Sequence, residues 1–390
     1  MVKDELDIIL ESLTELEQKS EEKTNNEEKN TEDEEINSVL RIPKIKILGI
    51  GGAGNNTVTN LISAGIQRAE AIAVNTDARQ LLISKAHRKI LIGKEICRGY
   101  GAGSDPEIGE KAAEESKEKI EEILRGTDLL FITCGLGGGT GSGAAPYIAE
   151  LARNMGILTV SVCTLPFAAE GRRKMKIAEQ ALKRLIKASN TTIIIPNDKL
   201  LQFASQATLL DAFRVIDDVL VKAVIGITDL VTRIGKVNVD FADVRKVLSV
   251  GGSAVIGIGE AEASGGNRAR EALENALLNP LLDVDLRTAK AALLNITAGK
   301  DITLEETHWI IQTISSLLTE NTNDDEEPLK WGAILDRKMN GKIRITIIMT
   351  GISLPYIDEN GNLLYPVILR KSDIDERKEY LKSLGIDIFE

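Results

Sequence analysis

Apolar residues in this chain gather in short strand-length runs, and longer segments with helical periodicity separate these runs. Strand-like runs are found at 44–50, 71–75, 89–92, 129–134, 157–164 and 192–196. Helical patterns are found at about 55–65, 107–125, 144–154 and 171–188. Strands that alternate with helices in this way predict a parallel sheet with helices on both of its faces. Ligands of such sheets bind beyond the carboxyl ends of the strands, so we expect function in the segments that follow the strands.

The second half of the chain follows a different pattern. Residues 209–234 contain no proline and carry apolar side chains along one helical stripe, which predicts a long central helix joining two domains. After it, strands are predicted at 254–258, 291–297, 331–335 and 343–349, and helices near 241–249, 267–278 and 304–319. This order indicates mixed strand pairing, so we expect a separate, smaller α+β domain. The expected divisions of the chain are 1–40, 41–208, 209–235, 236–352 and 353–390.

The first forty residues differ sharply in charge from the rest. They hold fourteen acidic and four basic side chains, so they carry −10 of the chain's net charge of −11. A nearly neutral body with an acidic extension is a poor nucleic-acid binder, because phosphate contacts need clustered Lys and Arg. Apolar residues between Leu6 and Leu16 have helical spacing, whereas 19–38 has almost none and predicts disorder. We expect either a partner-binding helix on a linker or a solubility tail.

The composition disfavours a membrane-spanning protein and a protein with a cysteine-ligated metal site. No run of about 18 apolar residues occurs, so nothing in the chain is expected to span a bilayer. The three cysteines, Cys97, Cys134 and Cys163, are far apart and lack the spacing of metal ligands. We expect them to be reduced, buried thiols of a cytosolic protein, and we expect no protein-ligated metal site.

The main candidate for chemistry is the glycine string at 135–143, which directly follows the apolar run 128–134 and contains six glycines in nine residues. Glycine fills no core and costs backbone entropy on folding, so we do not expect packing to explain the string. Bare backbone can approach a ligand closely and point its N–H groups at oxygen anions. A flexible linker is the alternative, but a buried strand and a helix rarely flank a linker so tightly. The arrangement predicts a phosphate cradle.

Two more glycine stretches follow predicted strands. Residues 49–56 satisfy the G-x-G-x-x-G fingerprint of dinucleotide-binding folds, and residues 99–106 precede another predicted helix. Ser104 or Asp105 could simply cap that helix. However, one bound polyphosphate explains three such loops on one sheet better than three separate caps do.

A nicotinamide dehydrogenase is the first function that the fingerprint suggests. Such an enzyme has no use for a second glycine loop, and its hydride-transfer partner is hard to find, because the only histidines, His87 and His308, adjoin neither loop. A Walker-type NTPase is excluded because no lysine follows either glycine loop at the required spacing. Any phosphate is therefore expected to be held mainly by backbone N–H groups and helix ends.

Three polar or aromatic residues outside the glycine loops could hold the rest of a nucleotide. Glu170 ends a strand-like stretch, and a carboxylate there suits ribose hydroxyls better than phosphate. Phe213 and Asp217 lie one helical turn apart, so a phenyl ring could stack on a base while the carboxylate accepts two hydrogen bonds from guanine. A core Phe and a solvated helix Asp are the simpler alternative.

Asn238, Asp240 and Asp243 lead into the helix predicted at 241–249. The two carboxylates have N-cap and first-turn spacing, so they could serve only as helix caps. They could also position a water for attack on a γ-phosphate. In the phosphate cradle of their own subunit they would repel the nucleotide, so a neighbouring molecule is the better place for that role.

Taken together, these motifs resemble those of the FtsZ family, the prokaryotic homologues of tubulin. The resemblance extends from about residue 45 to 352 and includes the signature GGGTGSG and the segment NVDFADVRKVL. It implies a tubulin/FtsZ fold of the α/β class, with a Rossmann-like parallel-sheet GTPase domain that a long central helix joins to a smaller α+β domain. It also implies GTP and GDP as ligands, Mg²⁺ as their companion ion, and hydrolysis that head-to-tail polymerisation activates.

The resemblance assigns roles to individual residues. The catalytic residues would be Asn238, Asp240 and Asp243, which reach the GTP of the next subunit. The nucleotide would be held by Gly52, Ala53, Gly54, Asn55, Asn56, Ala102, Gly103, Gly137, Gly138, Gly139, Thr140, Gly141, Ser142, Gly143, Glu170, Lys174, Asn197, Phe213 and Asp217. Lys174 departs from the family, which usually has an arginine there; lysine keeps the charge but cannot bind bidentately.

The resemblance also implies partners and a location. The chain is expected to polymerise with itself at the mid-cell division site in the cytoplasm. It is expected to meet membrane-anchor and division proteins through the acidic N-terminal segment or the apolar C-terminal one at 386–389, which follows a helix predicted at 372–384. No direct membrane insertion is expected. A filament that hydrolyses GTP slowly or not at all and serves as a scaffold is the alternative.

Overall fold

A computed structural model of the chain describes residues 43–200, 209–232, 237–262, 267–278, 284–318 and 328–358, with a few positions beyond. The side chains at 200, 209–217 and 219 are outside the description. The predicted N-terminal helix at 6–16, the segment at 19–38, the C-terminal helix at 372–384 and the apolar end at 386–389 all lie outside the described residues.

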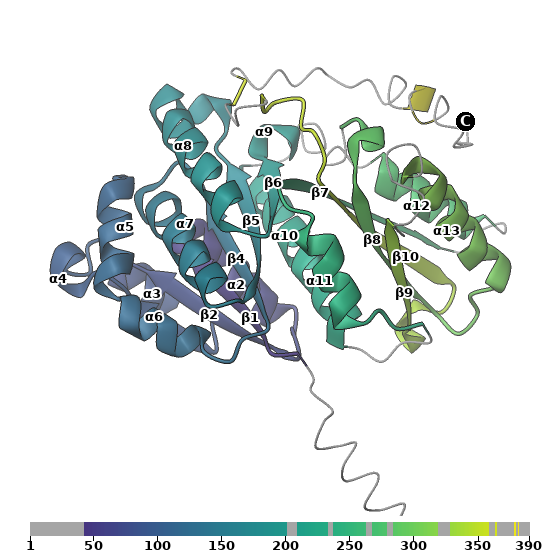
Figure 1. The fold of residues 1–390 in the computed structure, drawn as a ribbon, viewed down its shortest axis with the longest axis horizontal. Helices are drawn as coiled ribbons and strands as arrows, with labels where there is room; N and C mark the ends of the chain where they lie inside the picture. Colours follow the sequence, from purple (N-terminus) through teal and green to yellow (C-terminus); the bar gives the residue numbers. More distant parts are fainter. Residues whose placement is uncertain are drawn as a thin grey trace, which may run out of the picture. The chain divides into compact units, whose positions relative to one another are not determined.

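The described strands form one ten-stranded sheet with the order β3-β2-β1-β4-β5-β6-β7-β10-β8-β9 (Figure 1). The strands are β1 (Ile45–Ile50), β2 (Ala69–Asn75), β3 (Arg88–Leu91), β4 (Leu129–Gly135), β5 (Leu158–Leu165), β6 (Thr191–Pro196), β7 (Ser253–Glu262), β8 (Ala291–Ala298), β9 (Leu329–Leu335) and β10 (Lys342–Thr350). All ten coincide, within a few residues, with runs that the hydrophobic pattern predicts.

The two halves of the sheet differ in strand direction, as the pattern predicted. Strands β1 to β6 pair only in parallel, which brings the carboxyl ends of β1, β2, β4 and β5 to one edge. In the second half, β10 runs antiparallel to both β7 and β8, while β8 and β9 are parallel. A short parallel pairing of β6 with β7 joins the two halves, so the expected second domain continues the same sheet.

Helices cover both faces of the sheet. They are α2 (Gly51–Ser63), α3 (Ala78–Ile83), α4 (Lys94–Cys97), α5 (Pro106–Glu115), α6 (Lys117–Leu124), α7 (Gly139–Asn154), α8 (Arg172–Ala188), α9 (Asn197–Leu200), α10 (Leu209–Thr232), α11 (Phe241–Ser249), α12 (Arg268–Leu277) and α13 (Leu304–Leu318). Two begin earlier than predicted: α2 begins at Gly51 instead of near 55, and α7 begins at Gly139 instead of 144. Part of each glycine loop is therefore the first turn of a helix.

Alternate residues of the strands supply two hydrophobic cores, one on each face of the sheet. Ile47 packs in the core beneath α2, α10 and α11, whereas its neighbour Leu48 packs in the core beneath α5 to α8, α12 and α13. Both side chains are fully buried, and this two-residue alternation is what a sheet covered on both faces requires. Cys97, Cys134 and Cys163 are buried and free, as predicted. No helix in the described residues is long and apolar enough to cross a membrane.

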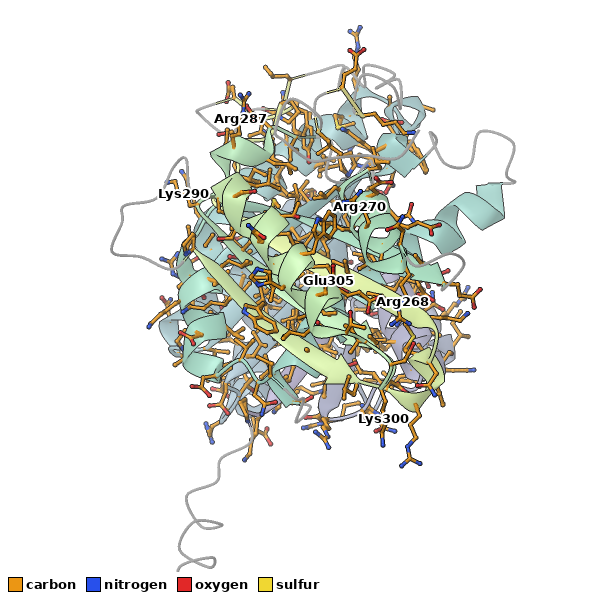
Figure 2. All side chains as sticks on the ribbon, turned by 90° about the vertical axis from the view of Figure 1, so that its right-hand side faces the viewer. Arg268, Arg270, Arg287, Lys290, Lys300 and Glu305 are labelled. Carbon is orange, nitrogen blue, oxygen red and sulfur yellow. The ribbon has the colours of Figure 1, made fainter. Side chains whose placement is uncertain are left out.

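A buried arginine holds together the end of the sheet farthest from β3. Arg268, at the start of α12, is 7% exposed and pairs through Nε with Glu306 of α13 at 2.7 Å. Its guanidinium also pairs with Asp301 in the β8–α13 connection, and Asp301 accepts a hydrogen bond from the Gly341 backbone N–H. Arg270, labelled in Figure 2, lies over the ring of Trp309 at 5.2 Å. These charged groups are therefore paired within the fold, and their contacts join α12, α13 and the start of β10.

Candidate functional site

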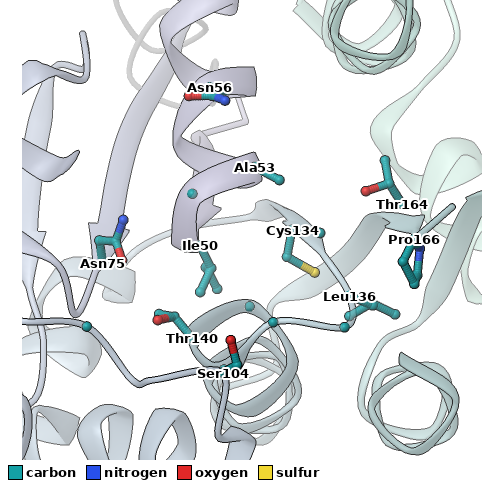
Figure 3. A pocket seen from close by; sticks show the side chains of 18 of the residues that line it. Ile50, Ala53, Asn56, Asn75, Ser104, Cys134, Leu136, Thr140, Thr164 and Pro166 are labelled. Carbon is teal, nitrogen blue, oxygen red and sulfur yellow. The ribbon is translucent and has the colours of Figure 1, made fainter. Parts of the chain in front are cut away.

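A pocket of about 620 Å³ opens at the carboxyl ends of the parallel strands, where the alternating pattern predicted it (Figure 3). Its walls come from the ends of β1, β2, β4 and β5, from the first turns of α2 and α7, and from the loop before α5. The lining residues are Ile50, Gly51, Gly52, Ala53, Asn56, Thr57, Asn75, Asp77, Gln80, Tyr100, Gly101, Gly103, Ser104, Cys134, Gly135, Leu136, Gly137, Gly138, Gly139, Thr140, Gly141, Thr164, Pro166, Glu170, Lys174, Asn197 and Leu220.

Two helices at this pocket, α2 and α7, begin without a side-chain cap from the described residues. In the part of the chain that the structure describes, no side chain caps α2 after Ile50 or α7 after Gly138. Two nearby helices are capped, because Asp77 accepts from the first turn of α3 and Asp105 from that of α5, whereas α8 also begins without a side-chain cap within the described structure. Uncapped N–H groups and the positive end of the helix dipole form an anion site. The cap is missing where the pocket would place an anion.

Packing explains more of the glycine string than the sequence analysis allowed. A β-carbon at Gly141 would lie 2.5 Å from the Gly135 carbonyl oxygen, and one at Gly143 would lie 2.0 Å from the Pro106 carbonyl oxygen. At Gly54 of α2 the nearest atom would be the Thr133 carbonyl oxygen, at 2.3 Å. The expectation that packing plays no part was therefore wrong. Small residues let α2 and α7 begin directly against the strand ends and α5.

One glycine of the string is open. A β-carbon at Gly138 would meet no described atom within 4 Å apart from its chain neighbours. Its backbone is extended, with φ −94° and ψ −179°, a conformation that any residue adopts. At this N-cap position glycine leaves the N–H groups of α7 exposed to the pocket, so its lack of a side chain points to a ligand.

Buried hydroxyl and amide groups fix the shape of the cradle. Ser142 Oγ accepts a hydrogen bond from the Gly137 N–H at 2.9 Å. The hydroxyls of Thr76 and Thr140 lie 2.7 Å apart and share a hydrogen bond. Asn55 is fully buried, and with its amide turned to satisfy its surroundings it donates to the Gly49 carbonyl at 2.8 Å. These groups support the cradle from behind.

A pair of opposite charges forms another wall of the pocket. Lys174 Nζ lies 2.8 Å from Glu170 Oε2, and Glu170 Oε1 accepts a hydrogen bond from the Phe167 N–H at 2.9 Å. Asp198 accepts from the Ala168 N–H at 3.0 Å and so holds the turn that carries Glu170. Burial raises the pKa of Asp198 above its usual range, and the charge of Glu170 raises this pKa further, while the hydrogen bond from Ala168 lowers it.

A buried acceptor points to a ligand at the same wall. Asn197 is 6% exposed, and its Oδ1 has no hydrogen-bond partner among the described residues. An unsatisfied buried acceptor costs free energy. Because Asn197 lines the pocket, a donor on a bound ligand would satisfy it.

Most of the predicted nucleotide-binding residues line the pocket. They are Gly52, Ala53, Asn56, Gly103, Gly137, Gly138, Gly139, Thr140, Gly141, Glu170, Lys174 and Asn197. Five others do not line it: Gly54, Asn55, Ala102, Ser142 and Gly143. All five are buried next to the lining. The side chains of Phe213 and Asp217 lie outside the described residues, so their roles stay predictions.

Several lining residues were not named individually as nucleotide-binding residues from the sequence. Asn75 ends β2, and Asp77 and Gln80 follow it; Thr164 lies in the last residues of β5, and Tyr100 lies in the segment between β3 and α5. The carboxyl-end rule, applied to every parallel strand rather than to the glycine loops alone, would have found them.

Asn238, Asp240 and Asp243 are not at this pocket. Helix α10 touches the pocket at Leu220 and extends about 18 Å farther to Thr232, at 1.5 Å per residue. There the Thr232 carbonyl accepts a hydrogen bond from Arg68, which immediately precedes β2, so α10 ends at the amino edge of the parallel strands. Asp243 lies 3.7 Å from Lys330 of β9. The pocket is therefore at the carboxyl ends of the parallel strands, whereas Asp243 lies beside the start of β9 in the mixed half of the sheet.

Asp240 is not used as a cap. It occupies the N-cap position of α11, but its side chain makes no capping hydrogen bond within the described structure. Asn238 and Asp240 are exposed, and Asp243 is half-buried. The simpler reading of the two carboxylates, as helix caps alone, therefore does not hold for Asp240.

Comparison with known families gives two matches along the chain. The family described as "Tubulin/FtsZ family, GTPase domain" matches residues 44–205. The family described as "FtsZ family, C-terminal domain" matches residues 252–353. Together they include the pocket lining except Leu220, and the strands of the mixed half of the sheet.

Individual relatives agree with these matches. "Cell division protein FtsZ 1" of Pyrococcus horikoshii is 54% identical over 327 residues, which is 83% of this chain and 86% of the relative. A Methanothermobacter thermautotrophicus protein, "Cell division protein FtsZ", is 49% identical over 80% of this chain and 81% of its own length. The solved structure "FtsZ dimer, empty (M. jannaschii)" has a TM-score of 0.77 and 45% identity over 85% of this chain and 95% of that one.

Proposed function

Because the chain belongs to the FtsZ family of tubulin-like cell-division GTPases, we propose that its pocket holds GTP and that a neighbouring subunit completes the site. As a member of this family the chain binds and hydrolyses GTP, forms filaments and acts in cell division. The observation that carries the assignment of the pocket is the pair of uncapped helix N-termini at α2 and α7. They face one polyphosphate-sized pocket with bare glycine backbone between them.

The phosphates are assigned to the glycine end of the pocket. The first-turn N–H groups of α2 and α7 supply donors and positive dipole ends, and Gly138 leaves the N-terminus of α7 open. Basic residues occupy 172–174 in the first turn of α8, where the positive end of the helix dipole repels them. A bound polyanion nearby would offset this repulsion. Backbone and helix ends, with Lys174, therefore take the place of a Walker lysine.

The nucleoside is assigned to the other end. Glu170 accepts hydrogen bonds from the ribose, and Lys174 keeps that carboxylate in place through their 2.8 Å contact. The unpartnered Asn197 Oδ1 accepts a donor of the nucleoside. Phe213 stacks on guanine and Asp217 accepts from its paired N–H donors; helix α10, which carries both, contacts α9 and lines the pocket at Leu220.

Catalysis is assigned to a site shared by two subunits. Asn238, Asp240 and Asp243 lie at the far edge of the sheet from their own pocket, so a head-to-tail neighbour presents them to the GTP. There the carboxylates orient a water for in-line attack on the γ-phosphorus, and the helix-end N–H groups stabilise the charge that develops on the phosphate oxygens. The water oxygen bonds to phosphorus, the bond to the β-phosphate oxygen breaks, and GDP and phosphate form.

We also propose that Mg²⁺ enters with the nucleotide. The described residues contain no group of three His, Cys, Asp or Glu side chains that could hold a metal ion. Mg²⁺ commonly binds substrate phosphates and water with few protein ligands, and the Thr140 hydroxyl and the Asn56 amide are oxygen donors at the phosphate end. The ion would neutralise phosphate charge there.

Assembly is proposed to place the filament at mid-cell in the cytoplasm, with membrane-anchor and division proteins bound through a terminal segment. A filament requires a heterologous contact that does not close on itself, and a pocket on one edge with its carboxylates on another provides such a contact. Deleting residues 1–40 or 370–390 and measuring the capture of division proteins would show which segment binds them.

The experiment that tests the shared site measures GTP hydrolysis against protein concentration. Wild-type hydrolysis per subunit should rise steeply where filaments form, and Asp243→Ala should bind GTP and polymerise with turnover lost. Asp301→Ala, which changes a carboxylate of the Arg268 network, is the matched control and should keep its turnover. Normal hydrolysis by dilute, monomeric Asp243→Ala would refute the shared site.

A further inference from the structure

Arg68 stands in a backbone conformation that arginine rarely adopts. Its φ is +62°, and only Arg98 and Ser104 share such a φ among the described residues other than glycine. The left-handed region crowds the β-carbon against the following carbonyl, so a non-glycine residue stays there only when its surroundings hold it. Arg68 therefore calls for a structural or functional reason.

The side chain of Arg68 supplies that reason. Its Nη1 donates a hydrogen bond to the carbonyl of Thr232, the last residue of α10. Carbonyls in the last turn of a helix have no partner within the helix and form the negative end of its dipole. Arg68 provides both a donor and a positive charge at that end.

The end of α10 is also connected to the segment that carries the carboxylates. A β-carbon at Gly332 of β9 would lie 3.2 Å from Leu230 Cδ2 and 3.1 Å from Val239 Cγ2, so both side chains rest on this glycine. The neighbouring Ala333 N–H donates to the Val237 carbonyl at 3.1 Å. The last turns of α10 and residues 237–239 therefore pack on the same part of β9.

We propose that Arg68 is a positioning residue for GTP hydrolysis, which acts on the active site of the neighbouring subunit. It ties the end of α10 to the amino end of β2, whose carboxyl end forms part of the subunit's own GTP pocket. Through the contacts at Gly332 it sets the placement of Asp240 and Asp243. The inference rests on the shared site proposed above.

The test uses substitutions that keep the backbone. Glycine and asparagine both tolerate a positive φ, so Arg68→Gly and Arg68→Asn should fold while they lose the contact with Thr232. GTP affinity and filament mass should stay as in the wild type, and turnover per polymerised subunit should fall about fivefold, because small misplacements of reacting groups slow catalysis. Arg68→Lys keeps the charge and a donor and should retain most of the turnover.

The chain offers a matched control for this contact. Arg153 Nη1 donates to the carbonyl of Lys187 in the last turn of α8, at 2.5 Å, and α8 packs on the face of the sheet opposite α10. Arg153→Asn should leave turnover per polymerised subunit unchanged. An equal loss in Arg153→Asn would show that any such contact matters and would overturn the specific role of Arg68.

Mixed filaments decide which part of the site Arg68 serves. Under this proposal, Arg68→Gly and Asp243→Ala subunits both have an intact GTP pocket, and both present impaired carboxylates to the neighbouring subunit. Every contact in a mixed filament is then impaired, so the mixture should hydrolyse GTP no faster than the average of the two variants alone. Recovery in the mixture would place the defect of Arg68→Gly in its own pocket and overturn the proposal. Wild-type turnover in Arg68→Gly would also overturn it, while the Asp243→Ala experiment would still judge the shared site.

Discussion

Two glycines of the string at 135–143 should respond to substitution in opposite ways. Gly143 packs against the backbone of α5, whereas Gly138 is open and faces the pocket. Gly143→Ala should destabilise the fold, and Gly138→Ser should stabilise the nucleotide-free protein while it weakens GTP binding. The pair separates a packing role from a ligand role within one motif.

The magnitude for Gly143→Ala comes from two opposing effects. In an uncrowded helix, alanine is favoured over glycine by about 1 kcal/mol. Here the new β-carbon would lie 2.0 Å from the Pro106 carbonyl oxygen and 2.6 Å from the Glu110 nitrogen, both backbone atoms of α5. Overpacking costs about 1–3 kcal/mol, and backbone atoms yield least, so we expect a net loss of about 2 kcal/mol in the free energy of unfolding.

The magnitude for Gly138→Ser follows from its N-cap position. Serine adopts the extended backbone seen there, and its hydroxyl can accept from the first-turn N–H groups of α7. We expect a gain of a few tenths of a kcal/mol without nucleotide, since serine caps slightly better than glycine. The hydroxyl then competes with phosphate for the same donors, so GTP affinity should fall about tenfold, which corresponds to about 1.4 kcal/mol.

The assay is urea unfolding followed by circular dichroism without nucleotide, together with titration of a fluorescent GTP analogue. A stability of Gly143→Ala equal to or above that of the wild type would refute the packing argument. Unchanged GTP affinity in Gly138→Ser would refute the assignment of phosphate to the N-terminus of α7.

Three further predictions concern charged groups. The Arg268 guanidinium holds the pKa of Glu306 below its usual range, so this pair stabilises the folded state above about pH 4.5, and the stabilisation is lost as the pH falls through the lowered pKa. Arg268→Met should therefore lose less stability than the wild type between pH 5 and 3 in thermal unfolding. A pH profile equal to that of the wild type would contradict this. Burial raises the pKa of Asp198, so its charge destabilises the folded state at neutral pH. Asp198→Asn keeps an acceptor for the Ala168 N–H and should raise the thermal unfolding midpoint at pH 7, and this difference from the wild type should vanish below about pH 3.8. A lower midpoint than the wild type at pH 7 would contradict this prediction. Lys174→Arg should bind GTP about two- to fivefold more tightly in titration, because a guanidinium can donate hydrogen bonds to two oxygens at once. Equal or weaker GTP binding would contradict the assignment of Lys174 to the phosphate site.

Local patterning was sufficient to predict most of the secondary structure. The ten strands and the long helix α10 appear where apolar runs and helical stripes predict them, because burial on one or both faces imposes a period that is visible in the sequence. The region 107–125 shows a limit: it forms two helices that meet at Ser116, whose Oγ accepts from the Gly93 N–H at 3.2 Å. Such a distant contact leaves no periodic signal.

The glycine helices show the same limit within the site. Helix propensity argues against beginning a helix at Gly51 or Gly139, yet α2 and α7 begin there. Close backbone contacts with Thr133 and Pro106 permit only glycine at Gly54 and Gly143, and these contacts exist only once β4 and α5 are in place. The sequence pattern therefore pointed to these glycines, but the packing contacts that restrict Gly54 and Gly143 to glycine are visible only in the fold.

The sequence by itself determined the strands, the helices, the glycine loops and the family to which their motifs belong. Each of these depends on residues close together in the chain. Only the tertiary structure decided that both groups of strands join in one sheet through β6 and β7, and that the pocket lies at the carboxyl ends of the parallel strands while Asp243 lies beside β9. Those facts follow from pairings between distant segments, such as Arg68 with Thr232, which no local pattern encodes.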